Sequence, residues 1–362
     1  MHKFIRLQNE QIINNPNLVN ELENGSEVVL QFSKPLYDAA VLTHIDALCK
    51  KYPQNLTVRF YAHYENKRSF DCKWLEYLPN VRRLTLDCLD TAANFSLLKE
   101  LQHLNALSVG IYQLADCCGT DFFTDFLSWE SLKKLSRLVL VQTKKSDIDL
   151  QYLAEYSNLT ELFIGAHIKN IGAVSACKNL AFLSLNIPSK QKSLDFCNGL
   201  SGLKKLRLIL GGRESIAEIE NPAIEELELF RVQGFKSLHN IEKMPNLQSI
   251  CIEDQKQLTE ICFAADLPKL KTLAILGCKT FGKLAGLAHL PALETLRLYK
   301  PALPFDDFFA CITESVTECV DGKKLGSLRY VDFYTMNKKE DARIAAILKA
   351  HGYEPAIIAP AE

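Results

Sequence analysis

The chain has 362 residues, of which 48% are hydrophobic and 23% are charged. Its 42 lysines and arginines almost balance its 43 acidic residues, so the formal net charge at pH 7 is -1. A chain of this length exceeds what one compact core usually supports, which predicts two or three ordinary domains or one elongated array of repeats. The balanced charge gives no general attraction to nucleic acids or anionic membranes, so we expect neither as a partner.

The first 25 residues are polar and lack the apolar run of a signal peptide. No sequence stretch reaches the roughly 18 apolar residues of a membrane-spanning helix. The twelve cysteines are scattered and form no CxxC pair, which is typical of small core residues and not of a disulfide framework. We therefore expect a cytoplasmic protein.

The front of the chain predicts a strand, a helix and a second strand. They cover residues 28–32, 35–53 and 55–64, with Pro35 in the first helical turn, where proline is tolerated. We interpret residues 1–69 as an N-terminal α/β cap.

A motif of the form LxxLxL, with other apolar residues replacing some leucines, recurs eleven times along the rest of the chain. It starts at residues 81, 104, 135, 159, 180, 203, 224, 247, 270, 293 and 328. Most intervals are 21 to 24 residues, and two longer intervals, of 31 and 35 residues, mark insertions at 113–126 and 301–324. A nearly constant period indicates stacked units, each too small to bury its apolar face alone.

Each unit changes its apolar spacing partway along. Before the motif, apolar residues recur every third position, as in Cys72, Leu75 and Leu78. Within the motif they alternate, as in Leu296 and Leu298. A spacing of three fits a 3-10-like or extended segment with one buried side, and a spacing of two fits a half-buried strand. The unit is therefore predicted to be a coil with a strand on one side and a 3-10 or extended segment on the other.

This pattern resembles the leucine-rich repeat family, specifically its short class of about 22 residues, found in internalin-like proteins and phosphatase regulators. The resemblance covers residues 70–336. It implies an α/β solenoid shaped as a horseshoe or arc, with a parallel β-sheet on its concave face. The family carries Asn or Cys at the ninth motif position, where the side chain bonds neighbouring turns, and only Cys278 fits here. We therefore expect irregular turns after the strands.

The second insertion contains apolar residues at helical spacing, which predicts a short helix in place of the usual convex segment. These residues are Phe305, Phe308, Phe309, Ile312 and Val316. Both insertions could decorate a binding face or seal the convex core. The first insertion also contains the neighbouring Cys117 and Cys118, which we interpret as structural or incidental cysteines.

The end of the chain predicts a second cap. Asn337 followed by Glu340 resembles a capping box, and Gly352 is suited to end the helix that follows. Residues 337–362 are therefore interpreted as a C-terminal capping helix and tail, which would cover the apolar end of the last repeat.

Alternation within each strand places the residues between the buried positions on the concave face. Large apolar and aromatic side chains on such a surface are typical of a binding site. Two clusters of predicted protein-binding residues result. The first comprises Val139, Val141, Phe163, Phe182, Lys205, Arg207, Ile209, Glu226, Glu228, Phe230 and Arg231, and the second comprises Tyr299, Tyr330 and Tyr334. The alternative is that some of these rings only pack against neighbouring rings.

The sequence contains none of the common catalytic motifs: no Walker loop, GxGxxG, HExxH or GxSxG. Of the eight histidines, only His167 is predicted at a solvent-facing strand end. Cys251 is predicted on the concave face, but no neighbour in sequence would lower its pKa. We expect no enzyme activity, no cofactor and no metal site.

The predicted function is non-catalytic binding of a protein partner through the concave face, by a chain that is a monomer alone. Aromatic anchors would enter the partner while the charged rim sets register and association rate. The resemblance to bacterial repeat proteins makes a cytosolic inhibitor of the immunity-protein kind one role. A regulatory or scaffolding subunit of an enzyme complex is an alternative, and an enzyme with an unrecognised site is a second alternative.

Overall fold

The computed structural model divides the chain into two compact units, Met1–Leu180 and Ala181–Glu362. Cys117, Cys118, nearly all of the first insertion and Val316 lie outside the residues that the structure describes. For residues 142–146 only the backbone is described. The described ranges are 3–9, 11–12, 15–61, 70–87, 93–110, 125–146, 148–187, 193–314 and 327–356.

The first unit contains a parallel sheet whose strands follow chain order. Its described strands are β1 (Phe4–Gln8), β2 (Glu27–Phe32), β3 (Leu56–Tyr61), β4 (Arg83–Asp87), β5 (Ala106–Gly110), β6 (Arg137–Ser146) and β7 (Glu161–His167). Its helices are α2 (Leu18–Glu23) and α3 (Ala39–Lys51), and its 3-10 segments are η2 (Cys72–Tyr77), η3 (Phe95–Glu100), η4 (Phe126–Ser128), η5 (Leu150–Glu155) and η6 (Ile171–Ala176).

The second unit repeats this plan. Its parallel strands are β8 (Phe182–Asn186), β9 (Lys205–Ile209), β10 (Glu226–Phe230), β11 (Ser249–Glu253), β13 (Thr272–Leu276), β15 (Thr295–Tyr299) and β16 (Tyr330–Tyr334). A second, two-stranded sheet contains β12 (Glu260–Cys262) and β14 (Lys283–Ala285). The 3-10 segments are η7 (Asp195–Gly199), η8 (Ile241–Lys243) and η9 (Leu287–His289), and the helices are α6 (Phe305–Glu314) and α7 (Lys338–Ala350). Among the described helices, none combines the length and the apolar character needed to span a membrane.

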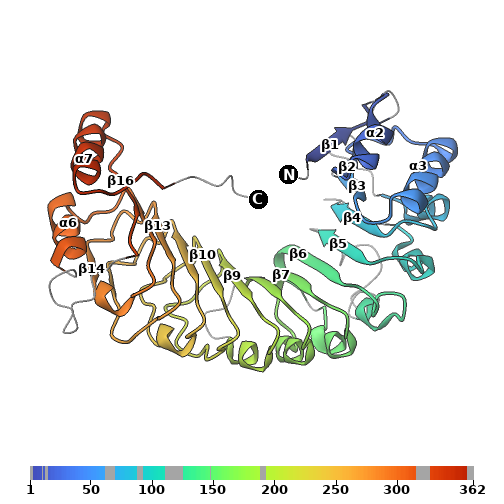
Figure 1. Ribbon diagram of the computed structural model, residues 1–362. Helices are drawn as coiled ribbons and strands as arrows, with labels where there is room; N and C mark the ends of the chain where they lie inside the picture. The colour runs from blue at the N-terminus through green and yellow to red at the C-terminus, as the bar shows by residue number, and fades with distance from the viewer. Residues whose placement is uncertain are drawn as a thin grey trace. The chain divides into compact units, whose positions relative to one another are not determined.

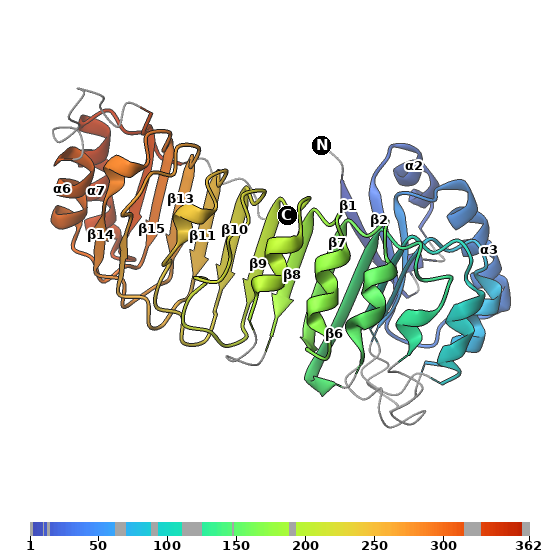
Figure 2. The ribbon, with the colours of Figure 1, turned by 90° about the horizontal axis from the view of Figure 1, so that it is seen from below.

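The predicted solenoid is confirmed within each unit. Every one of the eleven motifs becomes a strand that begins two residues after the motif starts. The spacing of three before the motif produces 3-10 segments such as Cys72–Tyr77 and Ile171–Ala176. In Figure 1 the strands of each unit lie side by side along one side of the ribbon, and the view from below shows 3-10 segments in front of the strands around β6 to β9 (Figure 2).

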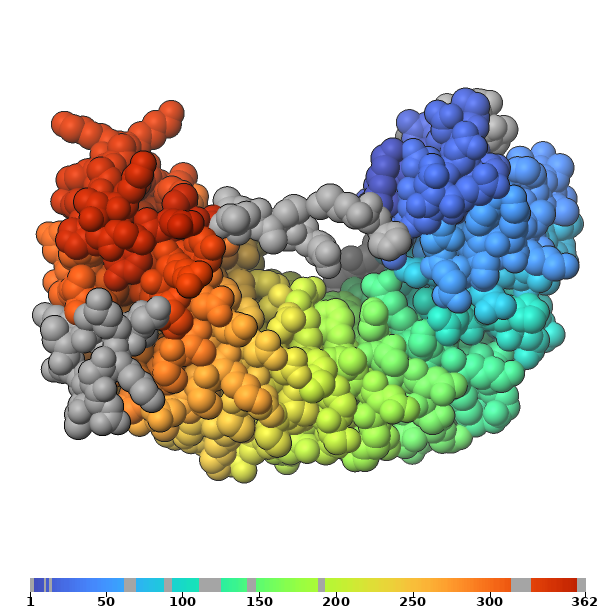
Figure 3. All heavy atoms as spheres, in the orientation of Figure 1, coloured from blue at the N-terminus to red at the C-terminus, as the bar shows by residue number. Residues whose placement is uncertain are grey.

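The core is a set of inward side chains aligned strand by strand. Leu206, Leu227 and Ile250 are aligned across β9, β10 and β11, and all three are fully buried. Burying each such side chain stabilises the fold by about 1.5–3 kcal/mol relative to leaving it exposed. The colours in the space-filling view follow chain order within each unit, so each repeat packs mainly on the repeats before and after it (Figure 3).

The turns after β9, β10, β11, β13 and β15 are regular, so the prediction of irregular turns was wrong for these five strands. The residue after each of five successive strands has a left-handed backbone with φ between 51° and 68°, and its N–H donates to the last carbonyl of the next strand at 2.7–2.9 Å. These residues are Leu210, Arg231, Asp254, Gly277 and Lys300. A backbone ladder therefore replaces the missing asparagine side chains.

The front of the chain differs from the prediction in two ways. The helix begins at Ala39 and not in the turn at Pro35, because Asp38 caps it by accepting the N–H of Val41 at 2.8 Å. Strand β1 and helix α2 were not predicted. Strand β1 pairs residue by residue with β2, but Leu7 is its only buried residue, so its apolar pattern in the sequence is weak.

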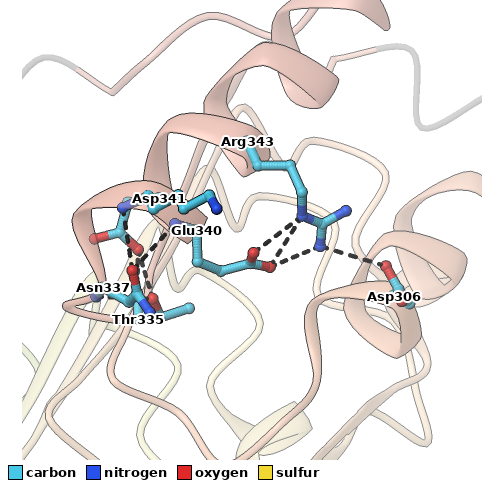
Figure 4. A network of polar contacts seen from close by, with 7 residues as sticks. Asp306, Thr335, Asn337, Glu340, Asp341 and Arg343 are labelled. Carbon is cyan, nitrogen blue, oxygen red and sulfur yellow. Dashed lines mark hydrogen bonds and ion pairs between the residues drawn. The ribbon is translucent and has the colours of Figure 1, made fainter.

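The C-terminal helix α7 confirms half of the predicted capping box. The Asn337 side chain accepts the N–H groups of Lys339 and Glu340 at 3.1 and 3.3 Å. Glu340 does not return to Asn337; its carboxylate pairs with Arg343 at 2.6 Å, and Arg343 reaches Asp306 of α6 at 4.0 Å (Figure 4). This network connects α7 to α6. The division into caps and repeats at residues 69 and 336 stays a prediction.

Gly286 joins β14 to η9 at a backbone φ of 75°. A Cβ atom at this position would lie 2.0 Å from the carbonyl oxygen of Phe263, and no side-chain rotation could relieve that contact. We expect Gly286→Ala to lower the free energy of unfolding by about 2–4 kcal/mol, measured by urea denaturation.

Gly282 provides the matched control, because the nearest atom to a Cβ there is 3.9 Å away. Gly282→Ala should change the free energy of unfolding by no more than about 0.5 kcal/mol. Equal losses in the two variants would contradict the steric explanation.

Candidate functional site

The strand residues between the buried positions of the second unit form a surface that we call the open sheet face. Its side chains alternate with the buried ones as predicted and form three columns aligned across β9, β10, β11, β13, β15 and β16. The columns are Lys205, Glu226, Ser249, Thr272, Thr295, Tyr330; Arg207, Glu228, Cys251, Ala274, Arg297, Asp332; and Ile209, Phe230, Glu253, Leu276, Tyr299, Tyr334.

Part of the first predicted cluster lies in the first unit. Val139 is aligned with Phe163 across β6 and β7, and Val141 lies two residues further along β6. All three side chains are half-buried. The rest of the cluster lies in the second unit and is described separately below.

Arg207 occupies the aromatic part of this cluster in the second unit. Its guanidinium carbon lies 5.2 Å from the centroid of the Phe182 ring and 5.5 Å from that of the Phe230 ring. The ammonium of Lys205 lies 5.8 Å from the centroid of the Phe182 ring. These are cation–π distances. Phe182 and Phe230 therefore hold Arg207 between them. Among the described residues, these rings contact cations and not neighbouring rings, so their predicted role in binding stays a prediction.

Ion pairs connect the same cations to the next strand. The Lys205 ammonium lies 2.9 Å from the carboxylates of both Glu226 and Glu228, and Arg207 also pairs with Glu228. Partial burial raises the pKa of Glu228, but the hydrogen bonds from Arg207 and Lys205 outweigh this effect and hold it below its usual value. Two cations and two anions make this network neutral, so it presents fixed charges without net charge.

The remaining residues of the first cluster border this network. Ile209 is half-buried at the end of β9. Arg231 lies just after β10, in the left-handed turn, where its Nε pairs with Asp254 at 2.8 Å. It therefore belongs to the rim of the open sheet face.

The second predicted group lies beside a hollow of about 470 Å³ at the ends of β11, β13, β15 and β16. Tyr299 and Tyr334 line this hollow, whereas Tyr330 does not. The hollow is lined by Glu253, Asp254, Leu276, Gly277, Arg297, Leu298, Tyr299, Asp332 and Tyr334. The predicted site omitted the charged members of this set. Their positions in the repeat could have identified them, because Glu253, Arg297 and Asp332 lie in the same outward columns as the predicted binding residues.

One partly buried ion pair lies in the wall of the hollow. Arg297 donates from Nε to Asp332 at 3.1 Å, and Asp332 is only 5% exposed. The second carboxylate oxygen of Asp332 accepts the N–H of Ala356 at 3.1 Å. Both oxygens of this buried carboxylate therefore have donors, as the cost of desolvating a charge requires. Tyr334, at 43% exposure, is one of the few exposed large hydrophobic residues of the described chain.

The prediction of a solvent-facing His167 was wrong. Strand β7 continues through His167, which is aligned with Ser146 and only 2% exposed. Burial lowers the pKa of His167 to about 4, and its Nδ1 has no hydrogen-bond partner among the described residues. A neutral, enclosed imidazole does not serve as a surface base.

Cys251 lies on the open sheet face as predicted and is half-buried. Burial, together with the nearby Glu228 carboxylate, raises the pKa of its thiol to about 11. The thiolate is the reactive form of cysteine, so this side chain is unreactive near neutral pH. Within the described ranges, no three His, Cys, Asp or Glu side chains are grouped to hold a metal ion.

His167 predicts a specific pH dependence of stability. Its pKa is about 4 in the folded chain and 6.5 at its ordinary value, so the unfolded chain binds more protons between these values. The free energy of unfolding should therefore fall as the pH drops from about 6.5 toward 4, by up to about 3 kcal/mol from this group. His167→Gln should remove that part of the dependence, measured by urea denaturation at several pH values. The exposed His103 gives the control variant, His103→Gln, and an unchanged slope in His167→Gln would refute the assignment.

The network at Glu228 predicts a measurable pKa change. Replacing Arg207 by methionine removes a hydrogen bond to the carboxylate, so the pKa of Glu228 should rise toward its usual value. A carbon NMR titration of the glutamate side chains would measure it. Arg231→Met removes an equal charge that pairs with Asp254 instead, and it should leave Glu228 unchanged. Identical titrations in the Arg207→Met variant and the parent chain would contradict the network.

No protein-family model and no curated protein sequence matches the chain. Among solved structures, an internalin from Listeria monocytogenes is 19% identical, with a TM-score of 0.47 over 80% of this chain and 83% of that chain. A leucine-rich repeat protein of Leptospira interrogans is 16% identical, with a TM-score of 0.44 over 97% and 95%. The leucine-rich repeat domain of the type III effector XopL is 15% identical, with a TM-score of 0.39 over 74% and 86%. By its own repeated motifs, parallel strands and 3-10 segments, the chain has the fold of a leucine-rich repeat solenoid.

Proposed function

We propose that this protein binds another protein through its open sheet face and performs no chemistry of its own. The observation that supports this best is the hollow of about 470 Å³, with Tyr299 and Tyr334 in its lining. Tyrosine is enriched at interface centres, because its ring supplies contact area and its hydroxyl stays hydrogen-bonded. An exposed aromatic side chain beside a hollow can insert into a partner surface, while the hollow can receive a side chain of that partner.

The rigidity of the surface favours the same function. Each strand of the open sheet face is hydrogen-bonded in register to its neighbours, so the outward side chains occupy fixed positions before any partner arrives. A preorganised surface loses little entropy on binding. The neutral network around Arg207 adds fixed charges of both signs, which favour one orientation of a complementary partner over others.

The test is affinity capture from a lysate of the organism that encodes the protein. We expect a partner that the parent chain recovers and that one of two variants binds at least about tenfold more weakly. The first variant is Tyr299→Ala with Tyr334→Ala, and the second is Phe182→Ala with Phe230→Ser. The control variant changes two exposed residues outside the open sheet face, Glu242→Ala with Lys256→Ala.

Recovery of the same proteins by the parent chain and by both aromatic variants would contradict binding through this face. Each variant must first show the circular dichroism spectrum of the parent chain. The activity of a captured partner, measured with and without the protein, then separates the possible roles. An inhibitor of the immunity-protein kind blocks one partner, whereas a scaffolding subunit recovers several proteins.

A further inference from the structure

The walls of the hollow combine apolar and aromatic surface. Tyr299 and Tyr334 are aligned on the neighbouring strands β15 and β16, and Leu276 contributes from β13. Gly277 keeps one side open, because a Cβ there would lie 2.5 Å from the Asp254 carboxylate. The volume of the hollow, about 470 Å³, lies within the range of pockets that bind drug-sized ligands, so it has room for an inserted side chain.

The charged side chains that line the hollow do not all have ion-pair partners. Its lining contains three acids and one arginine. Arg297 is paired with Asp332, and Asp254 is paired with Arg231 from outside the lining. Among the residues that the structure describes, the Glu253 carboxylate has no hydrogen bond or ion pair. The Lys300 ammonium lies 5.5 Å from the centroid of the Tyr299 ring, but within the described part of the chain it forms no ion pair with Glu253. The Glu253 carboxylate therefore remains without an ion-pair partner beside the two phenol rings, and the group that complements it is a cation.

Of the cations that proteins present, a guanidinium fits this lining best. Its planar fork donates two hydrogen bonds to one carboxylate, and its face stacks on an aromatic ring. An ammonium would satisfy the charge but would not stack in the same way. The hollow also opens on the same face as the neutral network around Arg207, which leaves room for a protein surface beside the inserted group.

We propose that the hollow is an arginine-binding site, in which a guanidinium presented by a protein partner bonds to Glu253 and stacks on Tyr299 or Tyr334. This proposal rests on the proposed function, since the arginine belongs to the protein that the open sheet face binds. It assigns the partner a chemical feature: an exposed arginine at the centre of its contact surface.

The first test uses N-acetyl-L-arginine amide as the probe, with the citrulline derivative as its neutral counterpart of similar shape. We expect a saturable NMR shift of the Tyr299 and Tyr334 ring signals with the arginine probe and none with citrulline. Glu253→Gln should weaken the arginine probe about tenfold, because it removes a charged acceptor. Glu242→Gln makes the same change at an exposed position of η8 and should leave the affinity unchanged. The absence of shifts, or equal affinity for the two probes, would overturn the site.

The second test uses a captured partner and separates this proposal from the proposed function. A partner that binds the parent chain and Glu242→Gln equally, but Glu253→Gln about tenfold more weakly, supports both. Equal binding by Glu253→Gln leaves protein binding intact and overturns the arginine site. A third outcome is possible: the arginine probe binds through Glu253, but the aromatic variants recover the same proteins as the parent chain. That outcome would overturn both the partner's arginine as the occupant and the proposed function.

Discussion

The constraint on which the structure depends is that one repeat cannot bury its own apolar side. Leu227 on β10 becomes fully buried only because Leu206 and Ile250 lie directly beside it on the neighbouring strands. A shift of one residue in any strand would bring charged side chains such as Lys205 into the core, because side chains alternate between the faces of a strand. Burial therefore sets the register, and the register sets the position of every outward side chain.

The same register produces two different surfaces on one sheet. Around β9 and β10, long side chains one strand apart satisfy each other, so Arg207 is enclosed by two rings and a carboxylate. Toward β13 the outward residues become small at Ala274 and Gly277, and the surface sinks into the hollow. Interacting groups fill the first region, whereas the second leaves space and an unpaired carboxylate. The hollow, where the outward side chains are small, is therefore the part of the face with space for a partner's side chain.

Most of the fold was predictable because its strongest signal is local. A strand buries alternate residues and a 3-10 segment buries every third residue, so both periods are visible in the sequence. The strands that follow Leu104 and Leu293 therefore lie where the motif predicts them. The failures have two separate causes. Strand β1 buries little and leaves a weak period, while the left-handed turns at residues such as Arg231 depend on backbone dihedral angles that side-chain spacing does not encode.

By itself the sequence determined the repeat, its strands and which side chains face outward, because these follow from apolar spacing along a short segment. Only the tertiary structure decided which outward groups find partners. Arg297 pairs with Asp332, 35 residues away, and Arg231 pairs with Asp254, 23 residues away. The Glu253 carboxylate has no hydrogen bond or ion pair with any of the described residues. His167 is enclosed because its strand extends beyond the motif. Such outcomes depend on distances between side chains of different repeats, which a one-dimensional pattern does not contain.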